Sequence, residues 1–124
     1  MGLTSCTAAL HLGLEACGIG PGDEVITPTM SFCATSNAVL HAGAVPIFVD
    51  SEEDTGNINA DLIERKITRR TKAILPVHLY GHLCDMRRLR KIADRRGLLL
   101  IEDAAHCLEG RRDEVMVGQL GDAA

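Results

Sequence analysis

Two carboxylates and a histidine follow directly on an aliphatic run late in the chain. The stretch LLLIEDAAHCLEG, residues 98–110, places Glu102, Asp103 and His106 after four aliphatic side chains. A buried strand avoids carboxylates, because burying a charge is costly unless it has a partner. Neighbouring side chains of a strand point to opposite faces, so we expect a structural role for Glu102. Asp103 then either faces a ligand pocket, caps the following segment or forms a buried ion pair.

A second group of residues has the types that bind metals. His78, His82, Cys84, His106 and Cys107 are all potential zinc ligands. Their spacing is not that of a standard zinc module and the sequence has no CxxC pair, so no metal site is expected. Cys107 could also form a nucleophilic pair with His106 or His82. Adjacent residues usually point apart, which speaks against the pair with His106.

Helix and strand patterns alternate along the chain. This alternation predicts an α/β protein with right-handed βαβ units and a mainly parallel sheet. Ligands of such sheets bind beyond the carboxyl ends of the strands, where the sequence places Asp50, His78, Tyr80, Glu102 and Asp103. The predicted helices cover residues 7–17, 31–43, 60–67 and 85–97, and the predicted strands cover 24–27, 44–50, 72–77 and 98–103.

Composition and charge limit the kinds of molecule that the protein is expected to bind. The 124 residues are 46% apolar, carry a formal charge of −4 and suit one modest domain or a piece of a larger one. The densest basic run, residues 87–96, is interpreted as the solvated face of a helix, so no nucleic-acid partner is expected. No apolar run approaches the roughly 20 residues that span a membrane. Five cysteines without a CxxC pair, and no signal peptide, favour free thiols and a cytoplasmic location.

Four stretches together resemble the DegT/DnrJ/EryC1/StrS family of sugar aminotransferases, in the order and spacing of that family. They are residues 5–50, 70–86, 98–110 and 117–124. The resemblance implies a pyridoxal-phosphate enzyme of the aspartate-aminotransferase fold, fold type I. It implies that residues 1–124 are part of the cofactor-binding large domain, with the small C-terminal domain absent.

The resemblance also implies roles for five residues. Asp103 would pair with the ring nitrogen of pyridoxal 5'-phosphate, because an anionic partner keeps the pyridinium protonated and able to accept electrons. Phe32 would stack on the ring, and His106 would contact it near the ring oxygen. Thr7 and Ala8 would hold the phosphate at a helix N-terminus, where free amide hydrogens attract anions.

The residues alone leave plainer roles open for some of these positions. Thr7 could be an ordinary N-cap, Phe32 a core side chain under the second helix, and His106 a structural histidine. Cys6 stands where the family usually has glycine, and a side chain there can crowd the turn or require another backbone angle.

The family's catalytic lysine has no counterpart in the sequence. The three lysines are Lys66, Lys72 and Lys91, and none matches the family position downstream of GDA. The catalytic residues are therefore unknown, and the chain alone is expected to be inactive. The resemblance implies a full-length homodimer that moves an amino group, with glutamate as donor, onto a nucleotide-linked keto-sugar. Two alternatives stay open, a truncated non-catalytic remnant that binds a partner and a lysine-free sugar dehydratase relative that uses the same cofactor.

Overall fold

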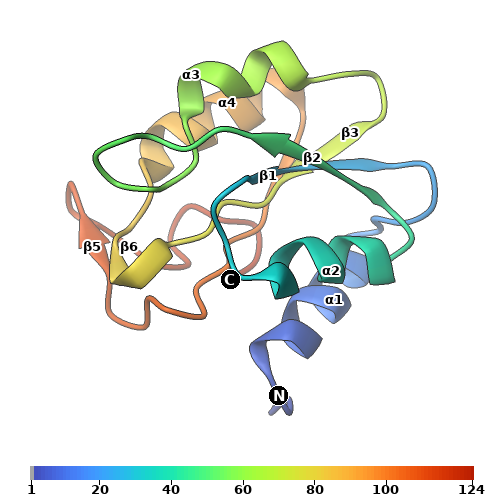
Figure 1. The fold of residues 1–124 in the computed structure, drawn as a ribbon, viewed down its shortest axis with the longest axis horizontal. Helices are drawn as coiled ribbons and strands as arrows, with labels where there is room; N and C mark the ends of the chain where they lie inside the picture. The colour runs from blue at the N-terminus through green and yellow to red at the C-terminus, as the bar shows by residue number, and fades with distance from the viewer. Residues whose placement is uncertain (1) are drawn as a thin grey trace.

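A four-stranded parallel sheet forms the frame of the structure, and helices cover both of its faces (Figure 1). The computed structural model describes residues 2–124. The sheet order is β2-β1-β3-β4, with strands β1 (Glu24–Pro28), β2 (Val45–Val49), β3 (Thr71–Ile74) and β4 (Leu99–Leu100).

The helical elements are α1 (Cys6–Ala16), α2 (Cys33–His41), α3 (Ala60–Ile63), the short 3₁₀ helices η1 (Glu64–Lys66) and η2 (Leu79–Gly81), and α4 (Met86–Arg96). A small antiparallel hairpin, β5 (Arg111–Arg112) and β6 (Val115–Met116), follows. The α/β class with a parallel sheet is confirmed.

Strand β1 is buried on both faces, and so is β3 apart from Lys72, as the aliphatic runs of the sequence require for a sheet covered by helices, whereas the edge strand β2 is partly exposed. Ile26, Ile74 and Leu100 pack with α3 and α4 in one hydrophobic cluster. Their neighbours Val25 and Ala73 pack with α1 and α2 in a second cluster on the opposite face. Figure 1 shows the two helix pairs on opposite sides of the sheet. Each large aliphatic side chain buried in this way stabilises the fold by about 1.5–3 kcal/mol.

Local signals set the ends of the helices. Asp85 caps α4 by accepting a hydrogen bond from the Arg88 amide, and Gly97 ends it in the left-handed conformation with φ of 64°. Ser5 caps α1 by accepting a hydrogen bond from the Ala8 amide. None of the helices among residues 2–124 has the length and apolar character needed to span a bilayer.

The fourth strand is shorter than the sequence predicted. Regular pairing covers only Leu99–Leu100, whereas the prediction covered residues 98–103. Beyond it, the chain continues through two isolated parallel bridges, Ile101 with Ala123 and Val77 with Asp103. Because the four strands are parallel, their carboxyl ends meet at one edge of the sheet, and Asp103 lies there.

A carboxylate at the opposite edge is held by a dense set of partners. Glu24 begins β1 and is buried, and Arg70 donates to its Oε1 from Nη2 at 2.6 Å and from Nε at 3.0 Å. Thr68 donates to its Oε2. The Thr68 hydrogen bond, with help from Arg70, lowers the pKa of Glu24 against the opposing effect of burial. The ionised form of Glu24 is therefore part of what stabilises the fold.

We expect the variant Glu24→Gln to lose about 1–3 kcal/mol of unfolding free energy at pH 7, because Arg70 loses its charged partner. The pKa of Glu24 is lower in the folded state than in the unfolded chain. Its contribution is therefore fully present above about pH 4.3 and is lost as the pH falls through the folded pKa. Urea unfolding of both proteins between pH 3 and pH 7 measures this. The exposed Glu53→Gln is the matched control, and an equal acid dependence in wild type and Glu24→Gln would contradict the assignment.

Candidate functional site

A pocket of about 180 Å³ opens between the N-terminal ends of α1 and α2 and the segment after β4. Four of the five residues predicted from the sequence line it, namely Thr7, Phe32, Asp103 and His106. Ala8 is not among the lining residues. The fold thus gathers residues from three separate parts of the chain at the carboxyl edge of the sheet.

Asp103 forms the buried base of this pocket. Only 4% of it is exposed, and its backbone is fixed by hydrogen bonds from its own amide to the Pro76 carbonyl, 2.9 Å, and from the His78 amide to its carbonyl, 3.0 Å. Its Oδ2 accepts from Thr35 Oγ1 at 2.7 Å and its Oδ1 accepts from the Ala105 amide at 3.2 Å. None of the ion pairs formed among residues 2–124 includes Asp103. The carboxylate is thus buried and hydrogen-bonded but has no basic partner among the described residues. Of the three roles that the sequence left open for Asp103, it takes two, because it caps the following segment and lines a pocket.

Glu102 faces the other way. Its Oε2 lies 2.8 Å from His78 Nε2 and accepts from the Gly118 amide at 3.1 Å, and its Oε1 accepts from the Gly121 amide at 2.8 Å. The Cys84 amide donates to His78 Nδ1 at 3.3 Å, which leaves Nε2 as the donor to Glu102. Glu102 therefore has the expected structural role. His78 is fully buried in this network and does not line the pocket, contrary to the expectation that it faces the cleft.

The aromatic groups lie at the rim. Phe32 is 70% exposed at the N-cap position of α2, so it is not the core side chain that the sequence left open as an alternative. His106 is exposed and stacks on Tyr80, with ring centroids 5.9 Å apart and planes 9° apart. Tyr80 adopts a left-handed backbone conformation with φ of 51°, which is uncommon for a residue of this size. The rim thus carries three ring systems, of which Phe32 and His106 line the pocket.

The start of α1 forms one wall of the pocket. Ser5 is the N-cap of this helix, so Thr7 is not, and its side chain is left to the pocket. The Ala8 amide is engaged by the Ser5 hydroxyl at 3.2 Å. Cys6 is the first residue of the helix and needs no positive φ, so the side chain at this position does not require glycine's backbone freedom. Burial, followed by the nearby Asp103 charge, raises the pKa of the Cys6 thiol, and its Sγ lies 3.9 Å from Asp103 Oδ1.

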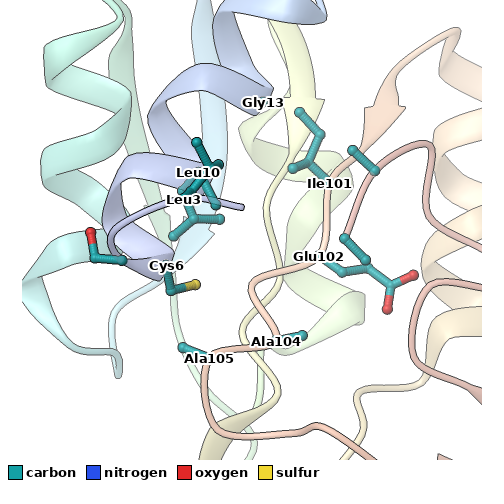
Figure 2. Close-up of a pocket in the computed structure, with 12 residues that line it drawn as sticks. Leu3, Cys6, Leu10, Gly13, Ile101, Glu102, Ala104 and Ala105 are labelled. Carbon is teal, nitrogen blue, oxygen red and sulfur yellow. The ribbon is translucent and has the colours of Figure 1, made fainter. Parts of the chain in front are cut away.

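A larger hollow of about 460 Å³ lies beside the first and shares Cys6, Leu10 and Ala105 with it. Its walls are mostly small or aliphatic side chains of α1 and of the segment after β4 (Figure 2). Figure 2 shows the Glu102 carboxylate pointing away from Leu3 and Leu10, toward the loop that it anchors. Apart from the Cys6 thiol, Glu102 is the one ionisable side chain that lines this larger hollow. We therefore look for polar ligand contacts in the smaller pocket.

The histidines and cysteines of the sequence do not form a joint site. Cys84 Sγ donates to the Val77 carbonyl at 3.2 Å and Cys107 Sγ to the Gly81 carbonyl at 3.3 Å. Burial raises the pKa of the Cys84 thiol to about 12. Cys107 is buried while His106 is exposed, so the two side chains point apart. Within residues 2–124, no three His, Cys, Asp or Glu side chains gather in a way that could hold a metal ion.

Thr35 and Ser31 are site residues that the sequence analysis missed. Thr35 is buried and donates to Asp103 Oδ2, and Ser31 Oγ lies 2.6 Å from Thr35 Oγ1. Their spacing of four residues across a helix start could have indicated a shared face. The contact with Asp103 spans 68 residues and leaves no local signal. None of the three lysines lines the pocket.

Comparisons with known proteins agree with this geometry. A model of the DegT/DnrJ/EryC1/StrS aminotransferase family matches residues 1–124. The spore coat polysaccharide biosynthesis protein SpsC of Bacillus subtilis is 48% identical over 121 residues, which cover 98% of this chain and 31% of the relative. GDP-perosamine synthase of Caulobacter vibrioides is 50% identical over 118 residues, covering 95% of this chain and 32% of the relative. The chain thus spans about a third of the length of these curated relatives.

Solved structures give the same result. NtdA from Bacillus subtilis, crystallised with bound cofactor PMP, superposes with a TM-score of 0.90 at 50% identity, over 96% of this chain and 26% of that one. The 3-amino-5-hydroxybenzoic acid synthase superposes with a TM-score of 0.91 at 41% identity, over 95% of this chain and 31% of that one. The fold is therefore that of the fold type I aminotransferases.

The Glu102 network gives a test of stability. We expect Glu102→Ala to lose about 1–3 kcal/mol of unfolding free energy, because the buried His78 and two glycine amides lose their shared acceptor. Urea unfolding at neutral pH measures this. Glu109→Ala, which removes an exposed carboxylate from the same segment, is the control and should cost less than about 0.5 kcal/mol. A loss below 1 kcal/mol for Glu102→Ala would show that the network is not needed.

Proposed function

The chain belongs to the DegT/DnrJ/EryC1/StrS aminotransferase family, and from this membership we propose that residues 1–124 form part of the large domain of a sugar aminotransferase. In this proposal they supply one wall of its pyridoxal 5'-phosphate site. The observation that carries the proposal is Asp103, a buried carboxylate without a basic partner among the described residues, at the base of a pocket lined by Thr7, Phe32 and His106.

The residues of the pocket fit this cofactor. A buried anion is costly unless a positive group or hydrogen-bond donors face it, and Asp103 has donors but no cation. A protonated ring nitrogen supplies the missing positive group. Phe32 presents an exposed aromatic face, and the first turn of α1 presents an anion-attracting helix N-terminus. The three features correspond to the ring nitrogen, the ring face and the phosphate of one molecule.

Each residue then has a separate task. Pyridoxal phosphate, when bound, supplies an electron sink for the carbon that loses its proton. Asp103 holds the proton on the ring nitrogen, Phe32 stacks on the ring, and His106 is an accessory contact held in place by Tyr80. Thr7 binds the phosphate at the start of α1. Ala8 is a proposed phosphate ligand only if its amide leaves the Ser5 hydroxyl.

We propose the substrates by similarity. Two relatives are named GDP-perosamine synthase, which supports a nucleotide-linked keto-sugar as the amino acceptor, and we propose glutamate as the donor. A homodimer of the whole protein and a cytoplasmic location are proposed likewise. All five cysteines are free, which agrees with a reducing compartment.

The proposal predicts that Asp103→Asn binds pyridoxal phosphate about tenfold to a hundredfold more weakly than wild type, because a charged hydrogen-bond partner is lost. Equilibrium dialysis of the protein, in the form that its own cells produce, measures the affinity. Asp54→Asn, at an exposed carboxylate, is the matched control. No binding by wild type, or equal binding by Asp103→Asn, would contradict the proposed site.

Phe32 gives a second test, because its exposure separates binding from stability. We expect Phe32→Ala to change the unfolding free energy by less than about 0.5 kcal/mol, because the ring is mostly exposed and contributes little to the hydrophobic core. The same change should weaken pyridoxal phosphate binding by about threefold to tenfold through lost stacking. Phe48→Ala, at the other phenylalanine, should leave the affinity unchanged. A large loss of stability with unchanged affinity would return Phe32 to a structural role.

A further inference from the structure

We infer that Thr35, supported by Ser31, is the positioning residue that fixes the Asp103 carboxylate relative to Phe32. This inference rests on the proposed function, because it concerns how the proposed ring contacts are held. Thr35 belongs to α2 and lines the same pocket, yet it is buried and its hydroxyl is directed at Asp103 Oδ2, 2.7 Å away.

The carboxylate needs such a partner, because the last side-chain torsion of aspartate is broad and only two-fold. A hydrogen bond on each oxygen is required to fix the plane of the group. The Ala105 amide holds Oδ1, and Thr35 alone holds Oδ2 among the hydrogen bonds of the described residues. Loss of the Thr35 hydroxyl therefore leaves a buried carboxylate oxygen without a donor and the plane of the carboxylate unfixed.

The number of available protons decides which group donates in each hydrogen bond between Ser31, Thr35 and Asp103. A threonine hydroxyl has one proton, and an ionised carboxylate can only accept, so Thr35 spends its proton on Asp103. Ser31 Oγ, 2.6 Å from Thr35 Oγ1, must then be the donor in that contact. The Phe32 carbonyl, 3.1 Å from Ser31 Oγ, is a competing acceptor for the same single Ser31 proton. Hydrogen bonds in such a series polarise one another, so Ser31 strengthens the bond from Thr35 to Asp103.

The same helix start carries both proposed ring contacts. Phe32 is the N-cap residue of α2 and has no side-chain hydrogen bond of its own to hold the helix end. Thr35 lies within the first turn, so a single turn of backbone and one hydrogen bond link Phe32 to Asp103. A planar ligand that meets an aromatic face and a carboxylate at once needs these two groups at a fixed mutual position. The Thr35 bond supplies that constraint across two distant parts of the sequence.

The test compares Thr35→Val, which keeps the shape and removes the hydroxyl, with Thr35→Ser, which keeps the hydroxyl. Ser36→Ala is the matched control, because it removes an exposed hydroxyl of the same helix. We expect Thr35→Val to weaken pyridoxal phosphate binding about tenfold in equilibrium dialysis, and Thr35→Ser to recover affinity to within about twofold of wild type. Ser31→Ala should give a smaller loss, about threefold, and Ser36→Ala none.

A double-mutant cycle separates positioning from a purely structural role. If Thr35 acts through Asp103, Thr35→Val should have less than a twofold effect on affinity in the Asp103→Asn background. Equal effects in both backgrounds, failure of Thr35→Ser to restore binding, or wild-type affinity in Thr35→Val would each overturn the inference while leaving the proposed function intact. If wild type does not bind the cofactor, or Asp103→Asn binds as wild type does, the proposed function fails first and the inference with it.

Discussion

The structure is organised around one constraint, the need to keep a carboxylate buried without a cation beside it. Asp103 meets this need by lying between two helix N-termini, with Cys6 of α1 near one oxygen and Thr35 of α2 on the other. Backbone amides at the start of a helix carry partial positive charge, so both helices favour an anion at this point. The parallel sheet places the start of α2, which follows β1, and Asp103, which follows β4, at the same edge.

The three buried carboxylates among the described residues differ in their hydrogen-bond partners and in whether they line the smaller pocket. Glu24 is held by Arg70 and two threonines, and Glu102 by His78 and two glycine amides. Both have full sets of partners and do not line the smaller pocket. Asp103 differs from both because the pocket lies beside it, and it differs from Glu24 because none of its partners is an arginine. A neutral shell leaves the carboxylate available to a positively charged ligand, which an arginine would prevent.

The sequence predicted the parts of this arrangement that depend on local patterns. The alternation of helices and strands, the position of Asp103 after a strand, and the opposite orientation of Glu102 follow from periodicity over a few residues. The sequence offered Thr7 as a possible N-cap of α1, whereas Ser5 holds that position, because two good cap residues lie close together and only the backbone decides between them. The Thr35 contact could not be predicted, because it joins a residue of α2 to one of the segment after β4, 68 positions away. His78 was misplaced for a similar reason, since its partner Glu102 also lies in the segment after β4.

The size and openness of the pocket decide what these residues can do by themselves. Its volume of about 180 Å³ is below the roughly 300–1,000 Å³ of typical small-molecule sites. Phe32 is 70% exposed and Tyr80 80% exposed, so the rim is open to water. Proton transfer at a substrate carbon depends on exclusion of water and on a base within hydrogen-bond reach. None of the described lysines lines the pocket. The proposed function therefore gives these residues the task of holding and orienting a ring, as one wall of a site that other groups complete.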